Sequence, residues 1–152
     1  MIKKLFLALA LGAALLPVAS ADSQDFIEKG LKEKDIKYSV VDGKFTTHWR
    51  GGVVVVSWVD TESSVLYICG YSSSRLPEAK WPLAYERLNT ERERSHLGFY
   101  LDSDGDVRVE HLVDIDDMEV SSKAYLASLS YVVKWLTRAH DEMMKVRYQF
   151  AE

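Results

Sequence analysis

Residues Leu88 to Ile115 read LNTERERSHLGFYLDSDGDVRVEHLVDI, and this stretch decides the fold. It contains the end of an expected helix, a strand, an Asp-Gly turn and a second strand. Apolar residues alternate with polar ones on both sides of the turn, which is typical of strands with one buried face. A three-residue turn centred on Asp104 pairs Leu101 with Val107 and keeps both apolar sets together. Gly105 supplies the left-handed backbone that such a turn needs, so we predict a β-hairpin in this register.

The same turn contains part of a calcium-binding pattern. Asp102, Asp104 and Asp106 take the first, third and fifth places of an EF-hand loop, which also needs Gly at the sixth place and Glu at the twelfth. Those two places hold Val107 and Val113. The sequence therefore favours an ordinary Asp-Gly turn, and calcium binding at the aspartates is kept as an alternative.

This segment is similar to the YbjN-type family of proposed bacterial sensory transduction regulators. The similarity is carried by Asn89 near the end of a helix and by HLGFYLDSDGDVRVEH at 96–111. Leu88 stands where the family has tryptophan. As an order of elements, the resemblance extends from Phe26 to Met143. It implies the type III secretion chaperone-like fold, an α/β sandwich that commonly dimerises and binds extended peptide, and it implies no catalytic residues.

The segment 1–21 has the composition of a signal peptide. Lys3 and Lys4 form a basic start, an apolar run occupies 5–16, and small residues end at Ala21, the expected cleavage site. The apolar run is too short to span a bilayer comfortably. We expect a bacterial protein that is periplasmic or secreted and not membrane-bound after cleavage; an uncleaved anchor is the alternative.

Cleavage after Ala21 leaves the segment 22–152, which has the length of one domain. The whole chain has a formal charge of −4, and the loss of two lysines changes it to −6. Such an acidic protein is a poor nucleic-acid binder, because phosphate contacts need clustered cations. The charges at 91–94 alternate in sign, as on a solvated helix face.

A meander of three or four strands is expected before the organising hairpin. The strands are predicted at 38–41, 44–50, 53–59 and 65–71, with turns at Asp42-Gly43 and Gly51-Gly52 and a loop at 60–64. The first turn places Val40 opposite Phe45, and a two-residue second turn places Phe45 opposite Trp58. A five-residue loop then sets Trp58 opposite Leu66 and Val56 opposite Ile68. In this register Val56, Trp58, Leu66 and Ile68 share the core face.

Three helices complete the expected fold. They are predicted from Ser23 to Lys34, from Pro82 to Arg92, and from a cap at Ser121 or Ser122 to Met144. The order α-β-β-β(-β)-α-β-β-α indicates an α+β fold, with one antiparallel sheet and helices mainly on one face.

The register leaves a second apolar set on the face opposite the core. This set comprises Val53, Val55, Tyr67, Cys69 and Tyr71. An exposed apolar patch of that kind usually marks an interface. We therefore expect the protein to bind another polypeptide, to form a homodimer, or both. Aromatic residues on such a face also leave glycan binding open.

The sequence contains no recognised catalytic, metal or cofactor motif. His48, His96, His111 and His140 lack partners at ligand spacing, and Cys69 is expected to be a buried, inert thiol. The primary hypothesis is a non-catalytic, chaperone-like or regulatory module without a cofactor. An enzyme of unrecognised type is the alternative, which requires a polar cleft that gathers His48, His111 or the acidic loops.

Overall fold

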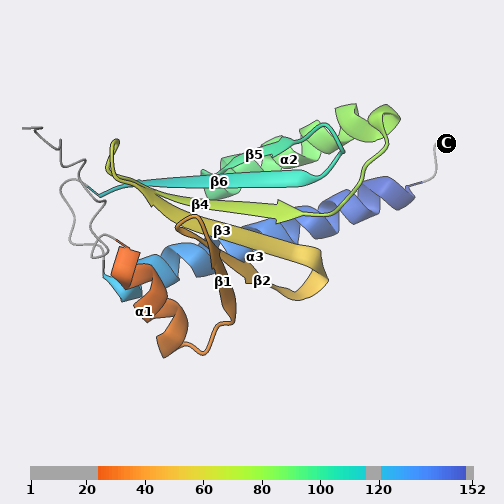
Figure 1. Ribbon diagram of the computed structural model, residues 1–152. Helices are drawn as coiled ribbons and strands as arrows, with labels where there is room; N and C mark the ends of the chain where they lie inside the picture. Colours follow the sequence, from red (N-terminus) through yellow and green to blue (C-terminus); the bar gives the residue numbers. More distant parts are fainter. Residues whose placement is uncertain (1–23, 116–120, 150–152) are drawn as a thin grey trace, which may run out of the picture.

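A six-stranded antiparallel sheet is the framework of the protein in the computed structural model, which describes residues 24–115 and 121–149 (Figure 1). Its elements are α1 (Asp25–Glu33), β1 (Tyr38–Val41), β2 (Lys44–His48), β3 (Val53–Asp60), β4 (Val65–Ser72), α2 (Trp81–Ser95), β5 (Gly98–Leu101), β6 (Val107–Asp114) and α3 (Ser122–Tyr148), with short 3-10 turns at Arg50–Gly52 and Glu78–Lys80. The strand order is β1-β2-β3-β4-β6-β5. The predicted α+β architecture is confirmed, and the meander has four strands. The expected cleavage site at Ala21 lies outside the described residues.

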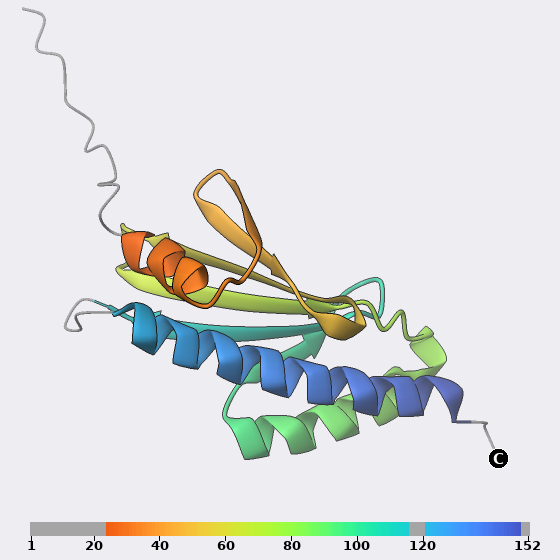
Figure 2. The same ribbon diagram turned by 90° about the horizontal axis from the view of Figure 1, so that it is seen from below.

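The helices form a layer on one face of the sheet. Helix α3 packs along β3, β4 and β6, and α1 and α2 pack against α3. Figure 2 shows α2 and α3 together on one side, with the β1–β2 hairpin rising on the other. The core lies between the layers, where Ile68, Val109, Leu129 and Val132 are fully or almost fully buried. None of the helices among the described residues combines the length and hydropathy that crossing a membrane requires.

The β5–β6 hairpin has the predicted register. Leu101 pairs with Val107, and the same ladder brings Phe99 opposite Val109. The N–H of Asp102 donates to the carbonyl of Asp106 at 3.0 Å, which closes the three-residue turn. The alternation of apolar residues therefore located the core face of this hairpin correctly.

The turn of this hairpin also anchors the loop that follows β4. The carbonyl oxygen of Gly105 accepts hydrogen bonds from the N–H of Leu76 at 3.0 Å and from the Ser74 hydroxyl at 2.9 Å. Gly105 has φ +75°, and a Cβ there would overlap the backbone of Leu76. Glycine is needed for both reasons, the backbone conformation and the close contact.

The predicted pairing of β2 with β3 is wrong by one residue. Phe45 pairs with Ser57 instead of Trp58, and His48 pairs with Val54. The reason is the turn, because Arg50 joins the two glycines in a 3-10 turn and makes the connection one residue longer than a two-residue hairpin. A shift of one residue moves every side chain of β3 to the other face.

The predicted pairing of β3 with β4 is also wrong by one residue. Trp58 pairs with Tyr67 instead of Leu66, and Val56 pairs with Cys69 instead of Ile68. Asp60 belongs to the strand, and its carboxylate accepts hydrogen bonds from the Glu62 N–H and the Ser63 hydroxyl, which shortens the loop to four residues. Each one-residue error reverses the face assigned to the next strand. The first error reverses β3, and the second restores β4, so the predicted face is wrong for β3 and correct for β4.

Val53 and Val55 therefore lie in the core, with 1% and 0% of their surface exposed. Their prediction as interface residues on the uncovered face is corrected. Val56, which is expected on the core face, and Val54, which alternation puts on the same side of the strand, lie instead on that uncovered face and are half-buried.

The last helix is longer than its pattern predicted. The Ser121 hydroxyl oxygen accepts a hydrogen bond from the N–H of Ala124 at 3.2 Å, which confirms one of the two expected caps. The helix continues past Met144 to Tyr148 because Val146 is still buried against the rest of the fold. Its length allows one helix to cover the central strands.

Candidate functional site: the open face of the sheet

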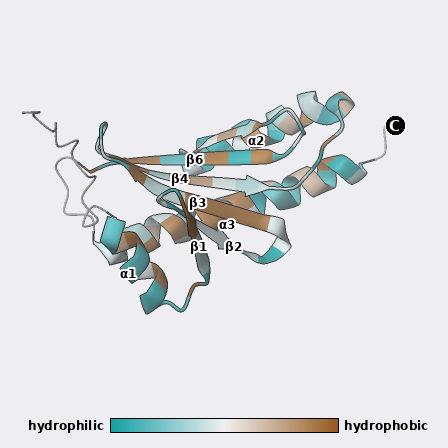
Figure 3. Cartoon of the chain, viewed as in Figure 1, coloured by the Kyte–Doolittle hydropathy of each residue, from teal (hydrophilic) through white to brown (hydrophobic). Residues whose placement is uncertain are grey.

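The face of the sheet that the described helices leave uncovered is called here the open face. Alternation and register assign to it Thr46, Val54, Val56, Trp58, Tyr67, Cys69, Tyr71, Tyr100, Arg108, Glu110 and Leu112. Figure 3 shows β3, which carries four consecutive valines, in the brown of high hydropathy. Leu112 is 54% exposed. The open face is thus apolar along its central strands even though no described helix packs against it.

Two aromatic rings on the open face stack against each other. The ring centroids of Trp58 and Tyr67 are 4.8 Å apart and their planes differ by 4°. Lys44 places its ammonium group 4.9 Å from the Trp58 ring. A sugar binds aromatic residues by stacking on a ring face, and here ring faces are taken up by neighbouring side chains. No observation on this face therefore favours the glycan alternative.

Charged groups at the other end of the open face are engaged with tyrosines. The Arg108 guanidinium lies 4.7 Å from the Tyr71 ring centroid, and its Nε is 3.3 Å from Asp102. The Tyr100 hydroxyl donates to Glu110 at 2.6 Å. Burial raises the pKa of Tyr100, and the hydrogen bond to Glu110 raises it further. Burial also raises the pKa of Tyr71, so both tyrosines are neutral at physiological pH and act as apolar surface with polar ends.

Cys69 lies in the middle of the open face, yet only 5% of it is exposed. Its neighbours across the strands are Val56 and Glu110. Burial raises the pKa of the Cys69 thiol to about 11, and the negative charge of Glu110 acts in the same direction. The prediction of a buried thiol is confirmed. A protonated, covered thiol is a poor nucleophile and a poor partner for a disulfide.

The structure brings part of the predicted interface set together. Tyr67, Cys69 and Tyr71 lie on the open face as predicted. Sequence reasoning missed Trp58 and Leu112, which share that face and stand beside Tyr67 on the two neighbouring strands. A correct register for β3 would have found Trp58. That these residues form an interface stays a prediction.

The four histidines are not gathered into one site. His48 is exposed at the end of β2, and His96 is exposed at the C-terminus of α2. His111 lies on the opposite, helix-covered face, where burial lowers its pKa. The cleft that the enzyme alternative required from His48 and His111 is therefore not formed by these residues.

One serine–histidine pair was not predicted from the sequence. Ser72 Oγ lies 3.1 Å from Nδ1 of His140, which is 68 residues away on α3. Ser72 is only 1% exposed, so its hydroxyl is not open to a substrate. We assign the pair a structural role, which is to join the end of β4 to α3.

The aspartates of the acidic turn are engaged with backbone groups. Asp102 Oδ1 accepts hydrogen bonds from the N–H groups of Asp104 and Asp106, each at 3.0 Å. Asp106 Oδ1 accepts from the N–H of Arg75 at 2.7 Å. Across residues 24–115 and 121–149 no group of three or more acidic, His or Cys side chains is placed to hold a metal ion. The carboxylates of Asp102 and Asp106 are used to build the turn and the loop beside it, so the structure gives no support to the calcium alternative.

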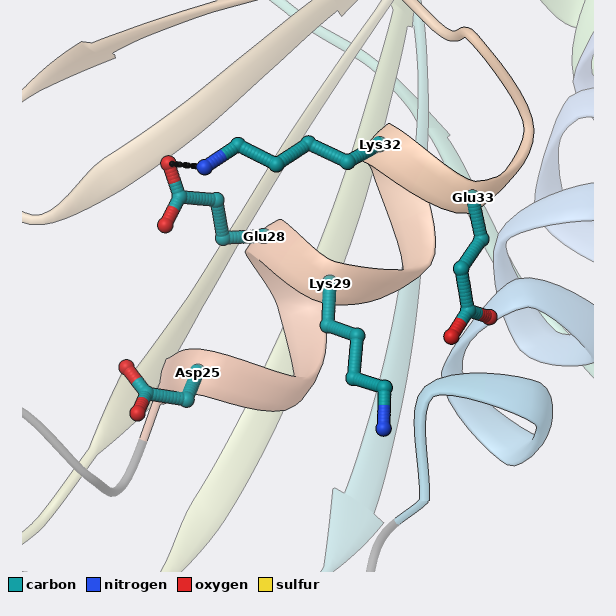
Figure 4. Close-up of a pocket in the computed structure, with 5 residues that line it drawn as sticks. All are labelled: Asp25, Glu28, Lys29, Lys32 and Glu33. Carbon is teal, nitrogen blue, oxygen red and sulfur yellow. Dashed lines mark ion pairs between the residues drawn. The ribbon is translucent and has the colours of Figure 1, made fainter.

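A hollow on the surface of α1 is lined by charged side chains of that helix alone. They are Asp25, Glu28, Lys29, Lys32 and Glu33, and Figure 4 shows them spreading from the helix in different directions. Glu28 pairs with Lys32 at 2.9 Å and accepts a hydrogen bond from the Tyr38 hydroxyl, which lowers the pKa of Glu28. Because Glu28 and Lys32 already neutralise each other, and Asp25, Lys29 and Glu33 point away from that pair, the hollow gathers no set of groups that indicates a ligand.

Comparisons with known proteins identify solved structures that have a similar fold. No family model and no curated protein matches the chain. A chain of the ExsC–ExsE complex aligns with a TM-score of 0.64 and 13% identity, over 82% of this chain and 96% of that one. YbjN from E. coli aligns with a TM-score of 0.59 and 10% identity, over 78% and 88% of the two chains. A chain of the HopA1–SchA chaperone–effector complex aligns with a TM-score of 0.55 and 12% identity, over 78% and 92%.

At such low identity these similarities show the fold alone. The class defined by the fold is the type III secretion chaperone-like α+β sandwich, which the sequence resemblance implied. YbjN is among the structures that share it.

Proposed function

We propose that this chain is an exported, YbjN-like module without catalytic activity, which binds another polypeptide or a second copy of itself through the open face. The observation that carries the proposal is the apolar surface on this face, which consists of the half-buried Val54, Val56, Trp58 and Tyr67 and the exposed Leu112. A folded domain rarely leaves such a surface free, and contiguous exposed apolar patches usually mark interaction sites.

The chemistry of the open face suits a polypeptide partner. It combines β-branched residues, stacked aromatic rings and tyrosine hydroxyls, and aromatic residues are enriched where proteins bind each other. Arg108 and Glu110 add charges of both signs near one end of the face. Recognition of a partner would rest on apolar burial in the middle of the face and on ion pairs near that end.

Two of the similar structures are complexes between proteins. One is described as the ExsC–ExsE complex and another as a chaperone–effector complex. These descriptions support a protein-binding, chaperone-like or regulatory role for this chain. The role requires no cofactor and no nucleic acid, in keeping with the acidic composition.

Export rests on the composition of the segment 1–21. We propose a mature protein that begins at Asp22 and acts in the periplasm or outside the cell, free of the membrane. Mass spectrometry of the protein purified from a periplasmic fraction tests this proposal. A mass that includes the segment 1–21, or recovery from the membrane fraction alone, would contradict it.

The binding proposal is tested by one substitution on the open face with a matched control. Val56→Lys places a charge in the middle of the face, whereas Ala127→Lys places the same charge on an exposed position of α3. Tagged mature wild type and both variants are incubated with periplasmic extract, cross-linked and compared by quantitative mass spectrometry. The expected result is a partner that wild type and Ala127→Lys retain and Val56→Lys loses.

Light scattering of the same three proteins at micromolar concentration separates a partner from a second copy. A dimer that Val56→Lys alone dissociates indicates self-association through the open face. A strict monomer whose captured proteins are identical in all three samples would overturn the proposed function. Circular dichroism confirms that each variant is folded before the comparison is made.

A further inference from the structure

The sequence contains two Asp-Gly steps, Asp42-Gly43 and Asp104-Gly105, and each lies at the turn of a β-hairpin. An Asp-Gly step can rearrange without an enzyme or a cofactor. The glycine amide nitrogen attacks the side-chain carbonyl carbon of the aspartate, and water leaves as a succinimide ring closes. Water then opens the ring at either carbonyl, which restores aspartate or leaves isoaspartate, in which the main chain runs through the former side chain.

The fold restrains the Asp104-Gly105 step. The Gly105 N–H donates a hydrogen bond to the carbonyl of Asp102 at 3.1 Å, so the nitrogen that would attack is already engaged. Gly105 is buried, and its own carbonyl accepts hydrogen bonds from Leu76 and Ser74. Ring closure requires the amide to lose its proton and the backbone of Asp104 to rotate, and these contacts oppose both.

The Asp42-Gly43 step lacks these restraints. Both residues are exposed to solvent. With the described part of the chain, the Asp42 carboxylate forms no hydrogen bond or ion pair, and the Gly43 N–H donates no hydrogen bond. The nearest group outside the turn is the side chain of Gln24, 3.7 Å from the position that a Cβ of Gly43 would take. The reacting atoms are therefore open to water and free of competing contacts.

The conformation of this turn also favours its opening. Asp42 has φ +49° and Gly43 has φ +73°, so both residues are left-handed, as in a type I′ turn. An aspartate tolerates that region less well than a glycine does. Strand β1 is short and lies at the edge of the sheet, and its last residues, Val40 and Val41, are exposed. Such a segment opens locally at a low cost in free energy, and opening gives Asp42 the rotation that ring closure needs.

We propose that Asp42 is a site at which this protein forms isoaspartate and that the fold protects Asp104 from the same reaction. Isoaspartate adds one carbon to the main chain, so a two-residue turn cannot keep the pairing of Val41 with Lys44. Loss of that pairing displaces Lys44, whose ammonium group lies 4.9 Å from the Trp58 ring on the open face. The reaction needs no partner, so this inference does not depend on the proposed function.

Peptide mapping of the purified mature protein, after prolonged incubation at mildly alkaline pH, tests the proposal. Isoaspartate has the mass of aspartate, but it changes the chromatographic retention of a peptide, and electron-transfer fragmentation distinguishes the two. We expect isoaspartate to accumulate at Asp42 at least about fivefold faster than at Asp104, because only the first turn opens locally. In guanidinium chloride the two rates should agree within about twofold, since unfolding removes the contacts that protect Gly105.

Incubation in water enriched in a heavy oxygen isotope counts the ring openings, since each opening adds one oxygen atom from the solvent. Asp42→Glu, whose longer side chain cannot close the same ring, should abolish this incorporation at position 42 and leave that at Asp104 unchanged. In the isolated isoaspartate form, backbone amide chemical shifts should change in β1 and β2 and not in β5. Equal rates at the two steps of the folded protein, a faster reaction at Asp104, or unchanged shifts in β1 and β2 would each overturn the proposal.

Discussion

Trp58 and Tyr67 stack face to face across β3 and β4, with their ring centroids 4.8 Å apart and their planes 4° from parallel. This pair forms because Trp58 stands on the open face, the reverse of what the expected register implied. An aromatic pair of this kind stabilises a protein by about 0.5–1.5 kcal/mol beyond the area that it buries. It also fixes the apolar surface on which the proposed function depends.

We predict an energetic coupling between the two stacked rings. Trp58→Leu and Tyr67→Leu should each reduce the free energy of unfolding, and the double variant should lose less than the sum by about 0.5–1.5 kcal/mol. Urea unfolding of the four proteins measures this coupling. Strict additivity would show that the stack contributes no specific stabilisation.

We predict that adjacent valines in β3 respond differently to the same substitution. Val55→Thr buries a hydroxyl in the core and should cost about 1–3 kcal/mol of unfolding free energy. Val54→Thr, on the half-buried open face, should stay within about 0.5 kcal/mol of wild type. Chemical denaturation of both variants checks the register of β3. The reverse order of stability would mean that β3 has the opposite face inward.

We predict that Gly105→Ala is far more harmful than Gly51→Ala. Both glycines have φ +75°, so both alanines carry the left-handed backbone cost of about 1–2 kcal/mol. Only at Gly105 would the new Cβ also overlap the Leu76 backbone, whereas nothing lies within 4 Å at Gly51. The additional loss should be about 1–3 kcal/mol, as for an overpacked core. Thermal unfolding of the two variants compares the two effects, and equal melting temperatures would contradict the predicted contact.

We predict that Cys69 resists thiol reagents in the folded protein. With a pKa of about 11, its thiol is almost entirely protonated at pH 8, and the fraction of reactive thiolate increases as the pH rises towards 11. Ellman's reagent at pH 8 should label the native protein at a small fraction of the rate seen in guanidinium chloride. Rapid stoichiometric labelling of the native state would show that the thiol is accessible.

The β5–β6 hairpin could be predicted from the sequence because the residues that determine its register are close together in the chain. Polar and apolar residues alternate on both sides of the turn, and Gly105 supplies the left-handed backbone that a three-residue turn needs. The face of β4 was assigned correctly as well, although only because two one-residue errors cancelled.

The face of β3 could not be predicted in this way. Val53 to Val56 are four identical residues, so polarity does not distinguish the buried positions from the exposed ones. The next two residues mislead, because Ser57 is buried and Trp58 lies on the open face. Ser57 is accepted in the core since the Tyr125 hydroxyl donates to it at 3.2 Å, from a position 68 residues later.

The sequence by itself therefore determined the order of elements, the central hairpin and the α+β class, since these follow from periodicity and turn residues close together in the chain. Only the tertiary structure decided which valines of β3 meet the helices, and which residues form the open face. It also brought Glu91 of α2 against Arg138 of α3 and so buried a carboxylate that was expected on a solvated helix face. The face of β3 depends on the turn at Arg50–Gly52, which is one residue longer than the two glycines suggest. The burial of Ser57 and of Glu91 depends on α3, which no local pattern of β3 or α2 contains.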